Sequence, residues 1–140
     1  MSKGLIDRIL NKLAKRDTPP YSVNVFTGSL FMNENQSVEW EDDGEWKSIS
    51  LVFSGYNNGA VQNYQWQVYT VPRAMIEQHQ GAGHTVIMAG SKTSPLATKY
   101  VYIRTTSVSG MLDNDDAAAT VNGSTISNAL YVLREVWLNY

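Results

Sequence analysis

Residues 46–53 read WKSISLVF, and apolar side chains alternate with polar ones along this stretch. Ile49 and Leu51 point to one face of an extended chain, with Phe53 in phase with them. Alternation of this kind is typical of a β-strand that buries one face and leaves the other in water. The stretch therefore predicts a strand, and it indicates a protein built mainly from sheets.

Comparable stretches lie on both sides of it. Strands are predicted at residues 21–26 and 29–32, around Thr27 and Gly28, and at residues 64–71, 85–89 and 99–106. Residues 121–124, VNGS, are typical of a tight turn. Residues 128–138 are predicted as a strand rather than a helix because Tyr, Val and Trp dominate them. With one helical turn expected within 73–80, the pattern predicts an all-β fold: an antiparallel β-sandwich or jelly roll with a short N-terminal α-helix.

The N-terminal segment has a different periodicity. Residues 3–16, KGLIDRILNKLAKR, predict an amphipathic helix that ends before Pro19 and Pro20. Its apolar residues recur at spacings of three and four: Leu5, Ile6, Ile9, Leu10 and Leu13. The chain thus divides into an amphipathic helix and Pro-Pro linker at 1–20 and a β-sandwich domain at 21–140.

A helix of this length is marginal alone in water, so its apolar stripe must be buried. Ile6, Ile9 and Leu13 form an a/d seam, and isoleucine at such positions favours three or more strands over two. The five apolar residues are therefore predicted to mediate oligomerisation, as a homo-oligomer and most simply a trimer. The alternative is that the helix folds back into a groove of its own domain.

Composition excludes several classes of function. Charged residues make up 17% of the chain, below the roughly 25% of an average domain, and Ser, Thr, Asn and Gln replace them. A net charge of −2 gives no attraction to nucleic acid, so no nucleic-acid partner is expected. The absence of cysteine excludes disulfides and thiol chemistry. No apolar run reaches the ~18 residues of a membrane span, so no membrane insertion is expected.

The chain contains no recognisable catalytic set, and we expect it not to be an enzyme. The acidic run from Glu34 to Glu45 is expected to be a solvated loop, and the alternative is that it attracts the basic N-terminal helix of its own or a neighbouring copy. A glycosidase needs two carboxylates from different elements facing a cleft, so a cluster on one short loop is weak evidence for that activity. His79 and His84 lie five residues apart in a glycine-containing loop, which is not the spacing of a helical metal pair. Residues 112–116 lack the glycine and distal glutamate of a calcium loop. No metal site or cofactor is predicted.

The aromatic residues suggest a binding surface. Trp46, Trp66 and Trp137 fall in predicted strands and are expected in the core, whereas Trp40 lies among acids and is expected to be exposed. A tyrosine- and amide-rich cluster follows Gly55. An aromatic ring packs against the C–H face of a sugar, and amides both donate to and accept from hydroxyls. The predicted saccharide-binding residues are Trp40, Tyr56, Asn57, Asn58 and Tyr64, although Asn and Gly also form ordinary turns.

Four segments carry a resemblance to a known family: GSLFM at 28–32, LVFSGY at 51–56, KYVYI at 99–103 and NALYVLREV at 128–136. From residue 27 to residue 140 the chain resembles the C-terminal domain of tail-associated structural and receptor-binding proteins of tailed phages that infect Gram-positive bacteria. The resemblance implies a β-sandwich, commonly trimeric, in a tail or baseplate appendage. It implies a virion protein made in the cytoplasm of the bacterial host, with other virion proteins as partners and no catalytic residues.

The leading expectation is a phage virion protein that attaches to host cell-wall saccharide. Two alternatives stay open at this stage. One is a purely structural decoration or adaptor protein of the virion with no saccharide site, and the other is a glycan-active enzyme.

Overall fold

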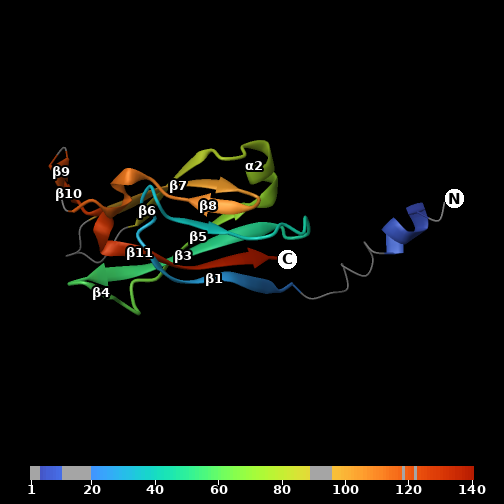
Figure 1. Cartoon of the computed structure of the whole chain (residues 1–140), viewed down its shortest axis with the longest axis horizontal. Helices are drawn as coiled ribbons and strands as arrows, with labels where there is room; N and C mark the ends of the chain where they lie inside the picture. The colour runs from blue at the N-terminus through green and yellow to red at the C-terminus, as the bar shows by residue number, and fades with distance from the viewer. Residues whose placement is uncertain (1–3, 11–19, 89–95, 118, 122) are drawn as a thin grey trace.

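The computed structural model describes residues 4–10, 20–88, 96–117, 119–121 and 123–140, and most of them form an antiparallel β-sandwich (Figure 1). One sheet has five strands, in the order β1-β11-β3 with β4 and β5 both paired to β3. The strands of this sheet are β1 (Ser22–Leu30), β3 (Ser48–Asn57), β4 (Ala60–Val61), β5 (Gln67–Pro72) and β11 (Tyr131–Asn139).

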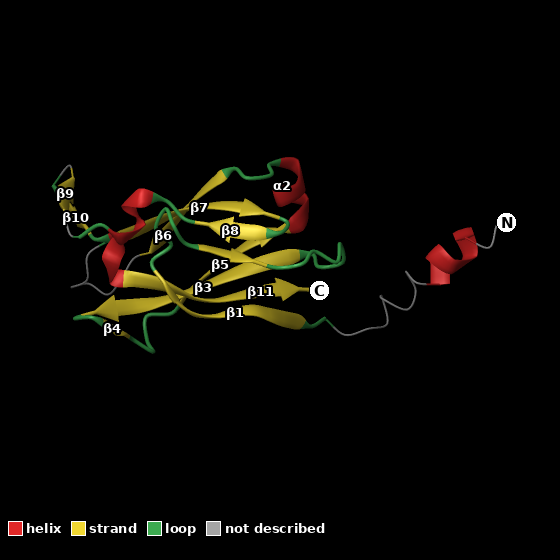
Figure 2. Ribbon diagram, in the orientation of Figure 1, coloured by secondary structure: helices red, strands yellow, loops and turns green. Residues whose placement is uncertain are grey.

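The second sheet has four strands in the order β2-β8-β7-β6, and a separate two-stranded hairpin joins β9 to β10. The strands are β2 (Ser37–Glu39), β6 (Gly83–Met88), β7 (Ala97–Arg104), β8 (Ser107–Ser109), β9 (Ala119–Val121) and β10 (Ser124–Ile126). Three short helices lie at the ends of the sandwich: α2 (Arg73–Gln78), η1 (Leu112–Asp115) and η2 (Asn128–Leu130) (Figure 2).

The core lies between the two sheets. Ile49, Leu51 and Phe53 of β3 are fully buried, as the alternation of residues 46–53 predicts, and they belong to one hydrophobic cluster with Val101 and Ile103 of β7. Burial of an aliphatic or aromatic side chain contributes roughly 1.5–3 kcal/mol, so these alternating faces are the main source of stability. The all-β sandwich with a short N-terminal helix is thereby confirmed.

Several local predictions are confirmed as well. The helical turn expected at 73–80 is α2, and Val121 and Ser124, the two ends of the predicted turn, pair with each other between β9 and β10. The segment 128–138 is a strand, as predicted, but its first three residues form η2. In the described part of the chain, no helix is long and apolar enough to cross a membrane.

The N-terminal strand differs from its prediction. Thr27 and Gly28 do not separate two strands, because β1 runs through them as one strand paired with β11. The pairing register shifts after Asn24 and again after Thr27, so bulges absorb the residues that resemble a turn.

The tryptophans also differ from their predictions. Trp46 is 1% exposed, as expected, but Trp66 is 45% exposed and lies outside the core. Trp137 is half-buried on the outer face, where its indole N–H donates to Glu135 at 2.8 Å. Trp40 is half-buried against the core instead of standing free in the acidic loop.

A buried polar cluster ties the segment before β2 to β7. Lys99 is fully buried, and its Nζ donates to the carbonyl oxygens of Phe31 at 2.9 Å and Asn114 at 2.5 Å. The Asn114 amide donates to the carbonyls of Met32 and Tyr100 and accepts the Tyr100 N–H at 2.9 Å. Because unpartnered buried polar groups cost about 1–3 kcal/mol each, this cluster fixes η1 against the sheet.

Residues 4–10 form a helix, within the predicted range 3–16. Its apolar residues Leu5, Ile6, Ile9 and Leu10 are between 41% and 57% exposed, so in this single chain they are not buried. Leu13 and the rest of the predicted helix lie outside the described residues.

Candidate functional site

One end of the sandwich carries a small pocket, where β3 ends and β11 begins. Its volume is about 180 Å³, and it is lined by Tyr56, Asn57, Gln62, Tyr64, Gln65, Leu130 and Tyr131. Pockets for drug-sized ligands are larger, roughly 300–1,000 Å³. The pocket therefore suits a small group, and its lining consists of phenols, amides and one leucine.

The turn between β3 and β4 shapes one wall. Asn58 and Gly59 have φ angles of 53° and 76°, and two successive positive values are typical of the primed turns that match strand twist. The chain then returns over Gly55: the Gln62 N–H donates to the Gly55 carbonyl at 2.8 Å, and the Gly55 N–H donates to the Tyr64 carbonyl at 3.2 Å. The turn thus brings residues 62–64 back beside the end of β3.

Gly55 makes room for the polar side of the pocket. A Cβ atom at this position would collide with the side-chain oxygen of Gln62 and lie 3.1 Å from that of Gln65. Two amide oxygens therefore occupy the space above the backbone of Gly55. Tyr131 pairs with Gly55 across the sheet, which places β11 next to these amides.

Arg134 holds the returning loop in place. Its guanidinium donates to Ser54 Oγ at 2.8 Å, to the Gln62 carbonyl at 3.1 Å and to Asn63 Oδ1 at 3.1 Å. The same group lies 5.0 Å from the ring centroid of Trp66. The Arg134 guanidinium therefore contacts the returning loop and the Trp66 ring, and Arg134 does not line the pocket.

Tyr131 carries an unusual hydroxyl. The residue is 1% exposed, and within the described chain its hydroxyl is the buried side-chain polar atom for which no hydrogen-bond partner is found. Burial raises the pKa of Tyr131, so the hydroxyl keeps its proton at neutral pH. Most buried polar groups in proteins are paired, so this one calls for an explanation.

The structure brings together three of the five predicted saccharide-binding residues. Tyr56, Asn57 and Tyr64 all line the pocket, and Tyr56 packs edge-on against Phe31 at 4.8 Å. Asn58 occupies the adjacent turn but does not line the pocket.

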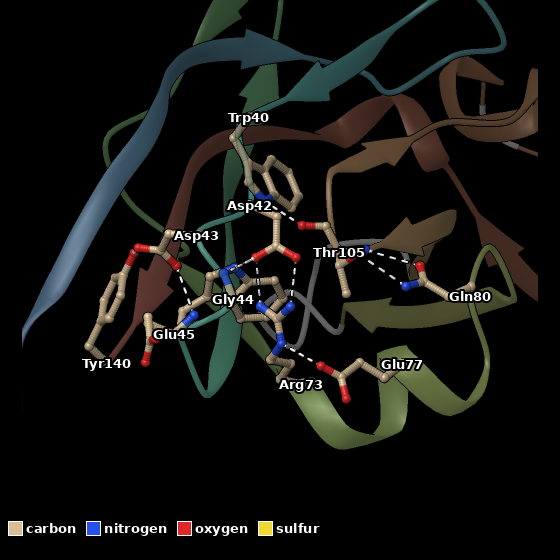
Figure 3. Close-up of polar contacts among 11 residues, drawn as sticks. Trp40, Asp42, Asp43, Gly44, Glu45, Arg73, Glu77, Gln80, Thr105 and Tyr140 are labelled. Atoms are coloured by element: carbon tan, nitrogen blue, oxygen red, sulfur yellow. Dashed lines mark hydrogen bonds and ion pairs between the residues drawn. The ribbon is translucent and has the colours of Figure 1, made fainter. Parts of the chain in front are cut away.

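Trp40 does not line the pocket; it lies beside Thr105 and the acidic loop (Figure 3). Its indole N–H donates to the carbonyl of Thr105 at 2.8 Å, and its backbone N–H donates to Thr106. The ring therefore packs against the turn between β7 and β8, apart from the four other residues predicted to bind saccharide.

The acidic loop is more ordered than a solvated loop. Asp42 accepts two hydrogen bonds from the guanidinium of Arg73, at 2.8 and 2.6 Å, and one from the indole of Trp46 at 2.9 Å (Figure 3). These bonds lower the pKa of Asp42 to about 2, the Arg73 bond first. Arg73 also lies 4.4 Å above the Trp46 ring and pairs with Glu77.

The neighbouring carboxylate holds the last residue of the sequence. Asp43 accepts a hydrogen bond of 2.5 Å from the Tyr140 hydroxyl, which lowers the pKa of Asp43 and raises that of Tyr140 to about 12 (Figure 3). Tyr140 stacks on Tyr21 at 4.6 Å. Asp42 and Asp43 are therefore engaged in structural contacts, and neither lines the pocket.

The two histidines lie in different settings. His79 is exposed at the end of α2, whereas His84 is buried in β6, where Nδ1 lies 3.2 Å from the Tyr69 hydroxyl. Burial lowers the pKa of His84. Among the described residues, no three His, Asp or Glu side chains gather into a group that could hold a metal ion.

Sequence reasoning missed much of the pocket lining. Four of the seven lining residues are not among the predicted saccharide-binding residues: Gln62, Gln65, Leu130 and Tyr131. Nothing in the sequence around Gln65 predicts its positive φ of 59°. Tyr131 of β11 reaches the pocket only because β11 pairs with β3. In comparisons with known proteins, no family model and no curated protein sequence matches the chain.

Proposed function

We propose that this domain binds a saccharide in the pocket at the end of β3, as part of a phage virion appendage that attaches to the host cell surface. The observation that supports it is the pocket lining: tyrosine rings stand beside amide side chains around a small cavity. Aromatic faces suit the C–H face of a sugar, and amides and phenols suit its hydroxyls.

The phage setting rests on the four segments at 28–32, 51–56, 99–103 and 128–136 and on the family they resemble. A tail or baseplate protein of that kind works as a homo-oligomer, attached to other virion proteins. The sandwich fold agrees with this setting, and the proposal places the protein in the virion.

Replacing Tyr64 with alanine is expected to weaken binding to host cells or cell-wall polysaccharide by about tenfold, with little change in stability. Tyr64 is 56% exposed and lines the pocket, so its removal takes away a ring face without opening the core. Binding is measured by cell pull-down or calorimetry, and folding by thermal denaturation.

Tyr21→Ala is the matched control. Tyr21 is similarly exposed, at 51%, but it lies beside Tyr140 at the opposite end of the sandwich. Equal losses in the two variants would contradict the placement of the site. A folded wild-type protein that binds no cell-wall saccharide would favour a purely structural virion component.

We further propose that the N-terminal helix assembles copies of the chain, because Ile6 and Ile9 are 43% and 42% exposed in the single chain. Ile9→Asp is expected to reduce the mass seen by light scattering from that of a trimer, since a buried charge costs several kcal/mol per chain. Asp7→Asn is the control on the same helix. A monomeric wild type at high micromolar concentration would refute the assembly.

A further inference from the structure

We infer that the pocket recognises a neutral sugar unit, and that one hydroxyl of this unit pairs with the hydroxyl of Tyr131. The inference rests on the proposed function and specifies its ligand. Its first support is the absence of formal charge: none of the seven lining residues is a Lys, Arg, His, Asp or Glu.

The second support is the polarity of the groups above Gly55. The side-chain oxygens of Gln62 and Gln65 converge there, close to where a Cβ would stand. The negative ends of these two amide dipoles repel a carboxylate or phosphate oxygen, and the Gln62 oxygen can accept a hydrogen bond from a sugar hydroxyl. The cation behind the loop, Arg134, is already bonded to Ser54, Asn63 and two backbone carbonyls, at 2.8 to 3.2 Å.

The third support is the hydroxyl of Tyr131. It belongs to a pocket-lining residue that is 1% exposed, and no hydrogen-bond partner is found for it among the described residues. A buried hydroxyl without a hydrogen-bond partner destabilises the ligand-free protein. A ligand that forms a hydrogen bond with this hydroxyl would offset that cost. A ligand hydroxyl beside Tyr131 would give it a partner.

Tyr131→Phe separates this role from a structural one. If the hydroxyl serves only the ligand, the variant keeps or raises the melting temperature and yet binds about tenfold more weakly. Tyr102→Phe, on half-buried Tyr102 of β7, is the control and should leave binding unchanged. Gly55→Ala is a second variant, whose added Cβ displaces the side-chain oxygens of Gln62 and Gln65. Because these are the ends of flexible side chains, the variant should fold, and its binding should fall.

The ligands to compare are oligosaccharides of neutral hexoses and N-acetylhexosamines, and oligosaccharides of similar length that carry uronic acid or phosphate. The expected result is binding of the neutral set only, with an affinity that changes less than about twofold between low and high salt. Preferential binding of the charged set, weakened by salt and by Gly55→Ala, would overturn the inference and leave the proposed function standing. If the folded protein binds neither set, both the inference and the proposed function are wrong. If Tyr131→Phe binds as well as the wild type, the Tyr131 hydroxyl has no role in binding.

Discussion

Raising the pH from 7 to about 9.5 is expected to stabilise the folded protein by roughly 3 kcal/mol, because of Lys99. Lys99 is fully buried, and burial lowers its pKa from the ordinary value of 10.5 to about 7, with Asp115 opposing the shift. A neutral amine has two N–H groups, and the carbonyls of Phe31 and Asn114 accept hydrogen bonds from this nitrogen.

The direction follows from proton binding. Between pH 7 and 10.5 the unfolded chain holds a proton on Lys99 that the folded chain lacks, so unfolding takes up a proton and higher pH opposes it. Below pH 7 Lys99 is protonated in both the folded and the unfolded chain, so the fold bears the full cost of burying its charge. Above about pH 10 the tyrosines with raised pKa, Tyr131 and Tyr140, act in the opposite direction, which sets the upper limit of the window.

Urea denaturation at several pH values measures the slope of the free energy of unfolding against pH. In Lys99→Met the slope should nearly vanish, and stability at about pH 9 should fall because two buried carbonyls lose their donor. Lys47→Met, which changes an exposed lysine, should keep the slope of the wild type. A wild-type stability that is flat or decreasing across the window would show that Lys99 stays charged in the fold.

Gly110→Ala is expected to destabilise the protein by about 3 kcal/mol or more, because an added Cβ would overlap backbone atoms. At Gly110 this atom would collide with the carbonyl of Met32 and lie 2.5 Å from the carbonyl oxygen of Asn33. Relief requires separation of two chain segments that are joined by hydrogen bonds from the Gly110 N–H to Gln36 at 3.1 Å and from the Met111 N–H to Met32 at 3.0 Å.

The comparison is with Gly4→Ala. Gly4 begins the described N-terminal helix, and a Cβ there meets nothing within 4 Å, so alanine should leave the stability of the sandwich unchanged. Chemical denaturation followed by tryptophan fluorescence measures both variants. A loss below about 1 kcal/mol for Gly110→Ala would mean that the contact between Met32 and Gly110 is easily displaced.

Alternation predicts that a strand exists but not which of its faces is buried. In residues 64–71 it groups Tyr64, Trp66 and Val68 on one face, and hydrophobicity favours burying that face. The structure buries Val71 instead and leaves Trp66 and Val68 45% and 64% exposed. The register of β5 against β3 decides this, and register depends on residues distant in the sequence.

The candidate site shows the same limit. Tyr56, Asn57 and Tyr64 could be predicted because they are close in sequence and share one chemistry. Tyr131 could not, since it reaches the pocket only through pairing with Gly55. The setting of Trp40 could not be predicted either, because the carbonyl that accepts its indole N–H belongs to Thr105, 65 residues away.

The stack of Tyr21 on Tyr140 has a consequence for how the domain is displayed. It places the start and the end of the sandwich chain side by side, whereas the pocket lies where β11 begins (Figure 1). A strand of nine residues separates the two ends by about 30 Å. A surface that holds the sandwich at Tyr21 or Tyr140, such as a biosensor chip, would therefore leave the pocket at the far end, and many copies held in this way would present their pockets to one opposing surface.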